Sequence, residues 1–464
     1  MKLTYLFALG AVALLARPAA AQNTYLDPTF QRPVILNGTS TGTVYDVVQQ
    51  PDGKYLIGGS FSSINGTRAR NLARLNHDGT LDAAFTASSQ ANGPVLSLAL
   101  QADGSLVAGG QFDSLAGAPR RFIGRLLPIG TLDAAFVPIV PAAAGRVNQV
   151  AIAPGGDVLS LTASGPSYGV SPTGLRRFGG AAGQPVPGFV PAVDAISITL
   201  QPDGKILTTG SAPAYVPTYM VARLLPNGSL DPGFAHRTNA AISSVWQVGL
   251  AANGDLYTAG NWYGGQLLRS EVAGPQGLLG VGGLNQVFGF EFQPNGRLLL
   301  RGQAVSAGQP VTSRILPTGQ VDASYVAANG PVNGSVGRFL VQPDGAIVLA
   351  GSFTLAGTTP VYGLVRMRDN NVLPTRSASP AEVGTNAWPI PATNVLHVQL
   401  VAIARPQQVS LLDNLGRLVL TCPVAGAADA LDLNVAALPA GVYVLHVRYG
   451  AEAAPVTRPV VLAR

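Results

Sequence analysis

The sequence repeats one unit seven times. Each unit holds a tight turn before an apolar run, as in Gln50-Pro51-Asp52-Gly53-Lys54 followed by Tyr55 to Phe61. Pro presets the φ of a turn and Gly accepts a positive φ, so this pentapeptide predicts a turn between two strands. The equivalent glycines, spaced by 42 to 52 residues, are Gly53, Gly104, Gly156, Gly204, Gly254, Gly296 and Gly345. A period of about 50 residues with several short strands per unit predicts a β-propeller or a solenoid.

A second motif follows the turn in each unit. In four units an Asp lies eight residues after an Arg, and these pairs are Arg74 and Asp82, Arg125 and Asp133, Arg223 and Asp231, and Arg314 and Asp322. A catalytic site needs one arrangement, whereas a clamp between blades needs one copy per blade. The planar guanidinium suits such a clamp. We therefore expect structural ion pairs here rather than catalytic groups.

An isolated half of the repeat at residues 26–30 indicates how the ring closes. Leu26-Asp27-Pro28-Thr29-Phe30 is an isolated copy of the Leu-Asp-x-x-Phe half, and the last unit stops at Leu364 to Arg368 without that half. We expect the N-terminal copy to complete the final blade. Closure of this kind removes free sheet edges.

Composition agrees with an all-β chain. Of 464 residues 56 are Gly, and only 11% are charged. Abundant turn residues with Val, Leu, Ile and Thr runs favour strands over helices. We predict a seven-bladed β-propeller over residues 22–370, a linker over 371–378 and a small C-terminal β-sandwich over 379–464.

Glycine closes the second apolar run in six units. A glycine inside a strand marks a bulge or a close backbone approach, and strands crowd most near a propeller's axis. We therefore expect these residues near the central channel: Gly59, Gly110, Gly210, Gly260, Gly302 and Gly351.

The joined motifs Gln-Pro-Asp-Gly-Lys and Arg-Leu-x-x-x-Gly-x-Leu-Asp-x-x-Phe resemble the delta-60 repeat family of bacterial β-propeller-like proteins. The resemblance spans about residues 26–368 and rests on two motifs that recur in phase. It implies a propeller scaffold and leaves the activity open, because that family is recognised by its scaffold.

The N-terminus reads as a signal peptide over residues 1–21. Lys2 precedes an apolar stretch from Leu3 to Ala16, and Ala19-Ala20-Ala21 offers a small-residue cleavage pattern. Spanning a bilayer needs about 20 apolar residues. We expect an exported chain whose mature part has no membrane-spanning segment.

The C-terminal region holds three blocks outside the repeat. Their characteristic residues are Pro389, Pro391, Ala392, Asp413, Gly416, Arg417, Leu438, Pro439, Gly441 and Tyr443. In this order the blocks resemble the type A sorting domain of type IX secretion in Bacteroidota, although Ile390 stands where that family usually has Asn. The resemblance implies the type IX machinery as a partner. It also implies export across the outer membrane to the cell surface or the extracellular space.

The sequence offers little for catalysis, metal binding or nucleic-acid binding. The four histidines have no metal-ligand spacing, and no cluster of five or more basic residues occurs. Glutamates, which could pair for glycoside hydrolysis, are rare: Glu271, Glu291, Glu382 and Glu452. We expect no cofactor, no metal and no nucleic-acid partner, and we lean away from an enzyme.

The fifth unit departs from the repeat through its aromatic residues, Trp246, Tyr257, Trp262 and Tyr263. Exposed aromatics stack on sugars or anchor protein partners. Trp246 and Tyr257 could instead be blade core. We predict a module that binds a glycan or a surface protein. The alternatives are a polysaccharide-active enzyme on a propeller and a structural or adhesive surface protein.

Overall fold

The computed structural model describes residues 26–141, 144–163, 174–209, 221–234, 242–251, 254–262, 267–270, 276–279, 281, 284–304, 312–323, 325, 332–356, 359–368, 385–388, 392–400, 406–413, 417–424, 428–449 and 456–463. The predicted signal peptide and the predicted linker lie outside these residues.

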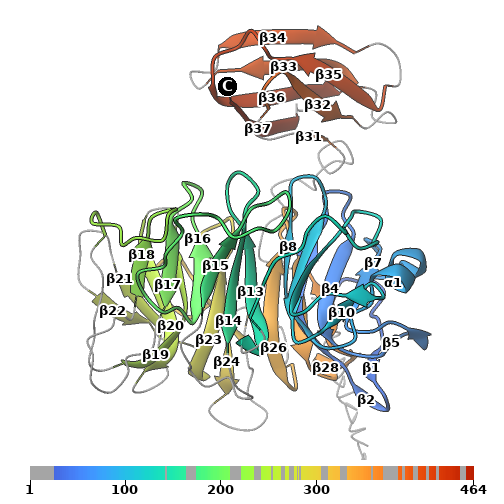
Figure 1. Cartoon of the computed structure of the whole chain (residues 1–464), viewed down its shortest axis with the longest axis vertical. Helices are drawn as coiled ribbons and strands as arrows, with labels where there is room; N and C mark the ends of the chain where they lie inside the picture. Colours follow the sequence, from blue (N-terminus) through green and yellow to red (C-terminus); the bar gives the residue numbers. More distant parts are fainter. Residues whose placement is uncertain are drawn as a thin grey trace, which may run out of the picture.

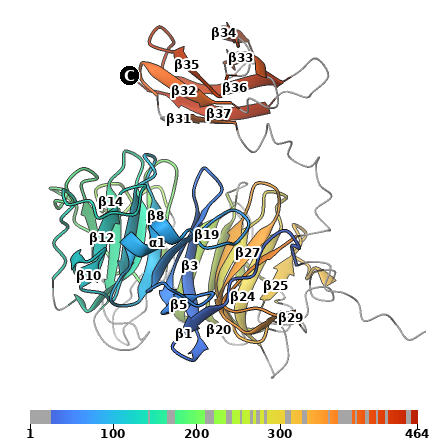
Figure 2. The same ribbon diagram turned by 90° about the vertical axis from the view of Figure 1, so that its right-hand side faces the viewer.

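Seven antiparallel sheets form the body of the protein, in chain order around a ring (Figure 1, Figure 2). The first strands of the blades are β3 (Thr43–Gln49), β8 (Val95–Leu100), β13 (Arg146–Ile152), β16 (Ser197–Leu200), β19 (Ile242–Leu250), β23 (Leu284–Phe292) and β26 (Ser335–Val341). The second strands are β4 (Tyr55–Ser60), β9 (Leu106–Gly110), β14 (Val158–Ala163), β17 (Ile206–Thr209), β20 (Leu256–Trp262), β24 (Leu298–Ala304) and β27 (Ile347–Ser352). The third strands are β7 (Leu72–Leu75), β12 (Ile123–Leu126), β15 (Leu175–Phe178), β18 (Val221–Leu224), β21 (Leu267–Ser270), β25 (Thr312–Ile315) and β30 (Leu364–Met367).

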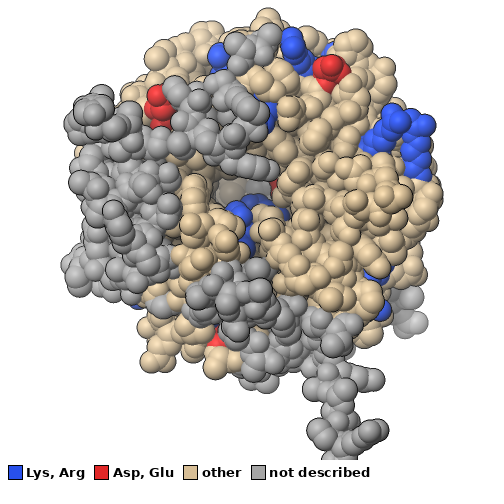
Figure 3. Space-filling view, turned by 90° about the horizontal axis from the view of Figure 1, so that it is seen from below, with Lys and Arg blue, Asp and Glu red and all other residues tan. Residues whose placement is uncertain are grey.

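The first strands form the inner wall of the ring. Each contacts the first strand of the next blade, from β3 against β8 round to β26 against β3. Apolar side chains fill the space between blades, as where Leu56 and Leu72 of the first blade pack on Val95 and Leu98 of the second. From below, the ring surrounds a central hollow (Figure 3). The predicted seven-bladed propeller is confirmed.

The ring closes as the isolated motif predicts. Leu26 bridges Met367 of the last blade, and Asp27 N–H donates to the carbonyl of Arg366 at 3.0 Å. Phe30 is 3% exposed and meets Tyr55 edge-on, in a core that also contains Ala350. The two ends of the repeat region are thus joined within one blade.

The fourth strand is shorter than the sequence suggests. Among the described residues, the fifth blade alone has a full fourth strand, β22 (Gln276–Leu279), whereas single bridges such as Leu75 with Leu81 take its place in other blades. The reason lies one residue later, since Asp82 caps α1 (Ala83–Ser89) by accepting from Phe85 N–H. A capping Asp turns the chain out of the strand direction.

The glycines that close the second strands are buried and face a bulge. The register of β3 on β4 shifts between Val44 and Asp46, opposite Gly59. A Cβ on Gly59 would lie 2.1 Å from the carbonyl oxygen of Thr43, and equally short distances occur at Gly110, Gly302 and Gly351. These residues pair with the innermost strands, as expected, and the bulged backbone is what excludes a side chain. Gly210 lies outside the described residues.

Short hairpins extend three consecutive blades, the seventh, first and second. They involve β1 (Ile35–Asn37), β2 (Ser40–Thr41), β5 (Ser63–Ile64), β6 (Thr67–Arg68), β10 (Ser114–Leu115), β11 (Ala118–Pro119), β28 (Leu355–Ala356) and β29 (Thr359–Pro360). In the first blade the hairpin turns at Asn65 and Gly66, both with positive φ. Asn-Gly is the sequence that such a two-residue turn requires.

The C-terminal region folds as a β-sandwich with its own core, as predicted. One sheet contains β31 (Asn386–Trp388), β32 (Val395–Gln399) and β35 (Ala430–Asn434). The other contains β33 (Pro406–Leu412), β34 (Leu418–Pro423), β36 (Gly441–Tyr449) and β37 (Val456–Leu462). Leu396 and Leu433 of the first sheet share one buried core with Val409 and Leu445 of the second.

Candidate functional site

The Arg–Asp pairs are clamps, as the repetition predicts. Arg74 lies 2.9 Å from the Asp82 carboxylate and 4.1 Å from the ring centroid of Phe85, and its Nη1 donates to the Pro128 carbonyl of the next blade at 3.0 Å. The equivalent ion pairs measure 2.7 Å for Arg125 with Asp133, 2.8 Å for Arg223 with Asp231 and 2.9 Å for Arg314 with Asp322. These arginines are therefore engaged in holding the outer parts of the blades together.

The third and fifth blades keep the clamp by moving the acid. Lys54 follows the turn glycine of the first blade and contacts Asp82 at 3.1 Å. In the third blade Asp157 occupies the position of Lys54 and pairs with Arg177 at 2.9 Å; in the fifth, Asp255 pairs with Arg269 at 2.7 Å. The carboxylate has changed strand while the arginine stays, so the irregular sequences of these units conceal a conserved contact.

A second repeating position lies on the inner wall. It falls seven residues before each turn glycine, and we call it the channel ring: Asp46, Ser97, Gln149, Ser197, Gln247, Gly289 and Arg338. Four members bind the backbone of the next blade. Leu98 N–H donates to Asp46 at 2.8 Å, Val150 N–H to Ser97 at 3.2 Å, Ile198 N–H to Gln149 at 3.0 Å and Phe290 N–H to Gln247 at 3.1 Å.

The sixth blade breaks this ring. Its channel-ring residue is Gly289, which pairs across the sheet with Arg301 of β24. A Cβ at Gly289 would lie 2.5 Å from Nη2 of Arg301, so the arginine occupies the space that a ring side chain fills elsewhere. The exchange puts a cation where four other blades carry a backbone clamp.

Four charged residues gather where the sixth, seventh and first blades meet. We call Asp46, Glu291, Arg301 and Arg338 the channel charge cluster. Arg338 Nε lies 3.4 Å from Oδ1 of Asp46. Its side chain is 46% exposed although β26 is an innermost strand, so the solvent that it meets belongs to the central hollow. Figure 3 shows Lys or Arg atoms in that hollow.

The cluster is not internally satisfied. The Asp46 carboxylate already accepts from Val47 and Leu98 N–H groups. Within the part of the chain that the structure describes, Glu291 and Arg301 form no hydrogen bond and no ion pair, and Arg338 forms only its contact with Asp46. Inner-wall charges without partners are unusual and mark candidate functional groups.

Burial and mutual charge shift the pKa values of the cluster. Burial raises the pKa of Asp46 and of Glu291, and Arg338 partly opposes both shifts. Burial and the nearby Arg338 lower the pKa of Arg301 to about 10, so Arg301 remains cationic at neutral pH. The carboxylate of Asp46 raises the pKa of Arg338.

The predicted aromatic residues separate into two groups. Tyr257 packs on Phe290 and Phe292 with centroid distances of 6.3 and 5.4 Å, so it is blade core. Trp246 is half-buried and meets Phe288 of the next blade at 5.3 Å. Trp246 and Phe288 are bulge residues, and each directly precedes a channel-ring residue in the chain.

Trp262 ends β20, where its backbone pairs with Ile242. Tyr263 lies outside the described residues, so the proposed role of this aromatic pair stays a prediction.

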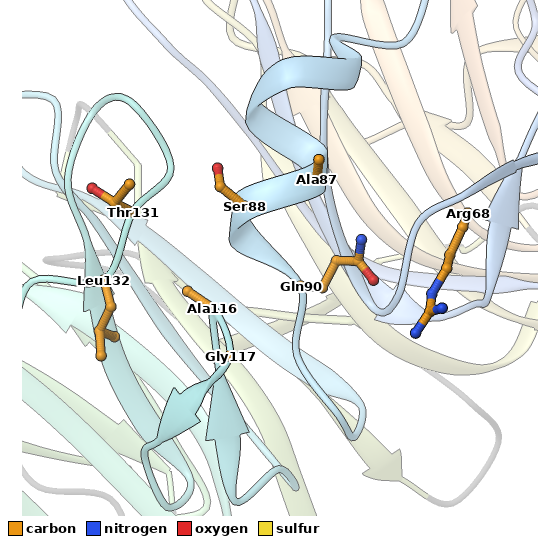
Figure 4. A pocket seen from close by; sticks show the side chains of 8 residues that line it. All are labelled: Arg68, Ala87, Ser88, Gln90, Ala116, Gly117, Thr131 and Leu132. Atoms are coloured by element: carbon orange, nitrogen blue, oxygen red, sulfur yellow. The ribbon is translucent and has the colours of Figure 1, made fainter.

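A surface pocket of about 610 Å³ lies between α1 and the hairpin of the second blade (Figure 4). Its lining is small and mostly uncharged: Arg68, Ala87, Ser88, Gln90, Ala116, Gly117, Thr131 and Leu132. One exposed arginine among short side chains provides few convergent polar groups, so the channel charge cluster is the stronger candidate.

The sorting-domain residues support turns and strand ends. Arg417 Nε donates to Asp413 at 2.7 Å across the β33–β34 hairpin. The Tyr443 hydroxyl donates to the Pro439 carbonyl at 2.8 Å, which ties the turn before Gly441 to β36. Leu438 N–H donates to Val435 at 3.0 Å.

The first sorting block is only partly described. Ala392 is fully buried, and its N–H donates a hydrogen bond to the Val461 carbonyl at 2.9 Å. Pro389, Pro391 and Gly416 lie outside the described residues.

Sequence reasoning missed most of the channel charge cluster. In the sequence Glu291 stands out only as one of four glutamates, and no motif marks Asp46, Arg301 or Arg338. Aligning the seven units on the turn glycine would have revealed Asp46, Gly289 and Arg338 at one position. It would not have placed Arg301, which reaches the site from another strand.

No helix among the described residues has the length and apolar character needed to span a bilayer. The same residues contain no group of three or more His, Cys, Asp or Glu side chains that could hold a metal ion.

Comparison with known proteins supports both parts of the architecture. Residues 50–85, 101–136, 201–234 and 342–368 match the domain of unknown function DUF5122 β-propeller, and residues 386–461 match the secretion system C-terminal sorting domain. None of the curated proteins compared with the chain matches it. The chain is thus a propeller with a secretion tail. It carries DUF5122 β-propeller repeats and a type IX sorting domain, which directs it to the cell surface or the extracellular space.

Solved structures with a similar arrangement are distant. PorZ, an essential surface component of the type IX secretion system of Porphyromonas gingivalis, is 11% identical with a TM-score of 0.45, over 91% of this chain and 59% of that chain. The extracellular domain of a putative hybrid two-component system from B. thetaiotaomicron is 12% identical with a TM-score of 0.46, over 93% and 57%. YCF48 from Cyanidioschyzon merolae is 10% identical with a TM-score of 0.46, over 74% and 100%. The chain spans less than two thirds of the first two.

Proposed function

We propose that this exported propeller is a binding module that takes a glycan or a surface protein at the centre of its ring. The observation that carries the proposal is the channel charge cluster, because Glu291 and Arg301 form no hydrogen bond and no ion pair with a described residue. The outer arginines are engaged in clamps that recur around the ring, so they are poor candidates for ligand contacts.

The inner wall also favours binding over scaffolding. Four of its ring positions bind the neighbouring backbone, which accounts for their polar character. Arg301 and Glu291 form no such hydrogen bond with a described residue. A partly buried charge without a hydrogen bond or ion pair costs stability. Its presence is best explained by a ligand that supplies the missing partner.

The proposal is tested by calorimetric titration of the full exported chain with a panel of neutral and acidic oligosaccharides, followed by product analysis of each mixture. The expected result is saturable binding with the saccharide recovered unchanged. Recovery of shortened saccharide would instead establish a polysaccharide-active enzyme. The absence of binding by every member would refute the glycan form of the proposal.

A further inference from the structure

The chemistry of the channel charge cluster indicates what kind of ligand fits. Arg301 approaches the inner wall beside Gln247, since Nη2 of Arg301 and Oε1 of Gln247 lie 2.5 and 2.3 Å from the same point, the Cβ position of Gly289. Arg338 reaches the hollow from the adjacent blade and forms no hydrogen bond with a described residue. Two guanidinium groups from neighbouring blades thus face one region.

The acids leave N–H donors of this pair unused. Asp46 accepts from two backbone N–H groups, at 2.9 Å from Val47 and 2.8 Å from Leu98, and its nearest contact with Arg338 is 3.4 Å, to Nε. Glu291 interacts electrostatically with both arginines without a hydrogen bond or ion pair to either. The remaining guanidinium N–H groups are donors for an additional anion. A carboxylate suits it, because its two oxygens match the planar fork of Arg.

Two further features select the rest of the ligand. Glu291 is an acceptor without a donor among the described residues, and an ionised carboxylate accepts from hydroxyl groups. The half-buried rings of Trp246 and Phe288 pack on each other, and each directly precedes a channel-ring residue, Gln247 or Gly289, in the chain. Aromatic faces stack on the C–H faces of sugar rings, with the edge of the indole left for polar contacts.

We propose that the channel charge cluster binds a carboxylate-bearing saccharide, with Arg301 and Arg338 on the acid, Glu291 on a hydroxyl and the Trp246–Phe288 pair against the ring. An acidic peptide fits less well, because its carboxylates bring no neighbouring hydroxyl for Glu291. This inference rests on the proposed binding function and narrows it to one ligand class.

The test uses the full exported chain and calorimetric titration with oligogalacturonate, oligoglucuronate and N-acetylneuraminate oligomers. The matched ligand control is the methyl ester of each acid, which keeps the hydroxyls and removes the charge. Poly-glutamate tests the peptide alternative. We expect binding of at least one acidic saccharide and at least tenfold weaker binding of its ester, since the ester lacks the negative charge that strengthens hydrogen bonds from the guanidinium groups.

The test variants are Arg301→Gln and Arg338→Gln, and the control is Arg32→Gln, which removes an exposed arginine from the linker before the first blade. We expect at least a tenfold loss of affinity in both test variants and none in the control. The melting temperature of Arg301→Gln should not fall below wild type, because Arg301 forms no hydrogen bond or ion pair with a described residue. Arg338→Gln should lower it, because this change removes the cation 3.4 Å from the buried Asp46. A purely structural Arg301 would show the opposite pattern, a lower melting temperature and an unchanged affinity.

The outcomes separate the two proposals. Equal binding of the acid and its ester, or an acid affinity unchanged in both Arg variants, overturns the carboxylate site while leaving a binding function in place. Preference for poly-glutamate overturns the saccharide class. Binding by no saccharide, neutral or acidic, overturns the glycan-binding function as well.

Discussion

Asp27 and Arg366 stand at opposite ends of the repeat region and are joined as neighbours within one blade. Asp27 N–H donates to the Arg366 carbonyl at 3.0 Å, and the Asp27 carboxylate lies 3.5 Å from Arg366 Nε. The same backbone contact joins Asp82 to Arg74 at 2.9 Å inside the first blade. The ring is therefore closed by the same backbone contact that other blades contain, formed here between the first and the last segments of the repeat region.

Replacing Asp27 with Ala should open this junction. The Asp27 side chain is fully buried and also meets Arg368 at 3.0 Å, so its loss removes two ion pairs, although Arg366 keeps Asp344 at 2.7 Å. The Thr29 N–H that donates to Asp27 also loses its acceptor, and such a loss costs about 1–3 kcal/mol. Denaturant unfolding of the propeller should show this loss, whereas Asp194→Ala, at an exposed position without a described partner, should leave stability unchanged. Equal stability of the two variants would contradict closure by Asp27.

The same carboxylate predicts a pH dependence. Burial alone would raise the pKa of Asp27, but hydrogen bonds from Thr29 and Arg368 and the charge of Arg366 lower it below 3.8. A depressed folded-state pKa stabilises the fold above the unfolded value, and this stability is lost as pH falls through the folded value. The stability gap between wild type and Asp27→Asn should therefore narrow below pH about 4. A gap that stays constant down to pH 2 would show that the charge is irrelevant.

The buried glycines predict a backbone requirement. Ala at position 59 would put its Cβ 2.1 Å from the Thr43 carbonyl oxygen, inside the first bulge. Such overpacking costs about 3 kcal/mol. Gly179→Ala is the control, because its Cβ would lie 3.7 Å from the nearest atom. Thermal unfolding should separate the two variants clearly, and a comparable melting temperature for both would contradict the tight bulge.

The sorting tail allows recognition to be separated from folding. Arg417 pairs with Asp413 at 2.7 Å, but its side chain is 73% exposed. Exposed ion pairs contribute only about 0–1 kcal/mol. We expect Arg417→Ala to reduce the fraction of protein at the cell surface, measured by protease accessibility, while hardly changing stability. Arg448→Ala, also exposed and in β36, serves as the control. Full surface delivery of Arg417→Ala would mean that the secretion machinery does not contact this residue.

The repeat period was enough to predict the propeller, its blade number and its closure. Asp27 could be assigned to the last blade because residues 26–30 are an isolated copy of the half motif that the last unit lacks. The Arg74–Asp82 pair could be assigned to structure because it recurs. These inferences needed only positions along the chain.

The channel charge cluster needed positions across the chain. In the sequence, Gly289 has no side chain at a position where most other units carry a polar one. The pairing of β23 with β24 shows that the side chain of Arg301 takes that place. Residue type leaves Trp246 open between a binding face and the blade core, and the structure places it in a bulge directly before a channel-ring residue. Strand register and bulges determine where Arg301 and Trp246 lie, and the local sequence predicts neither register nor bulge.

The central claim is that the exported propeller holds its ligand at the channel charge cluster. The most direct measurement is calorimetric titration of the wild-type chain and the Arg301→Gln variant with the same acidic oligosaccharide, with the mass of the recovered saccharide determined afterwards. The account predicts binding by wild type, at least tenfold weaker binding by the variant and an unchanged saccharide mass. Equal affinity of the two proteins, or a shortened saccharide, would contradict it.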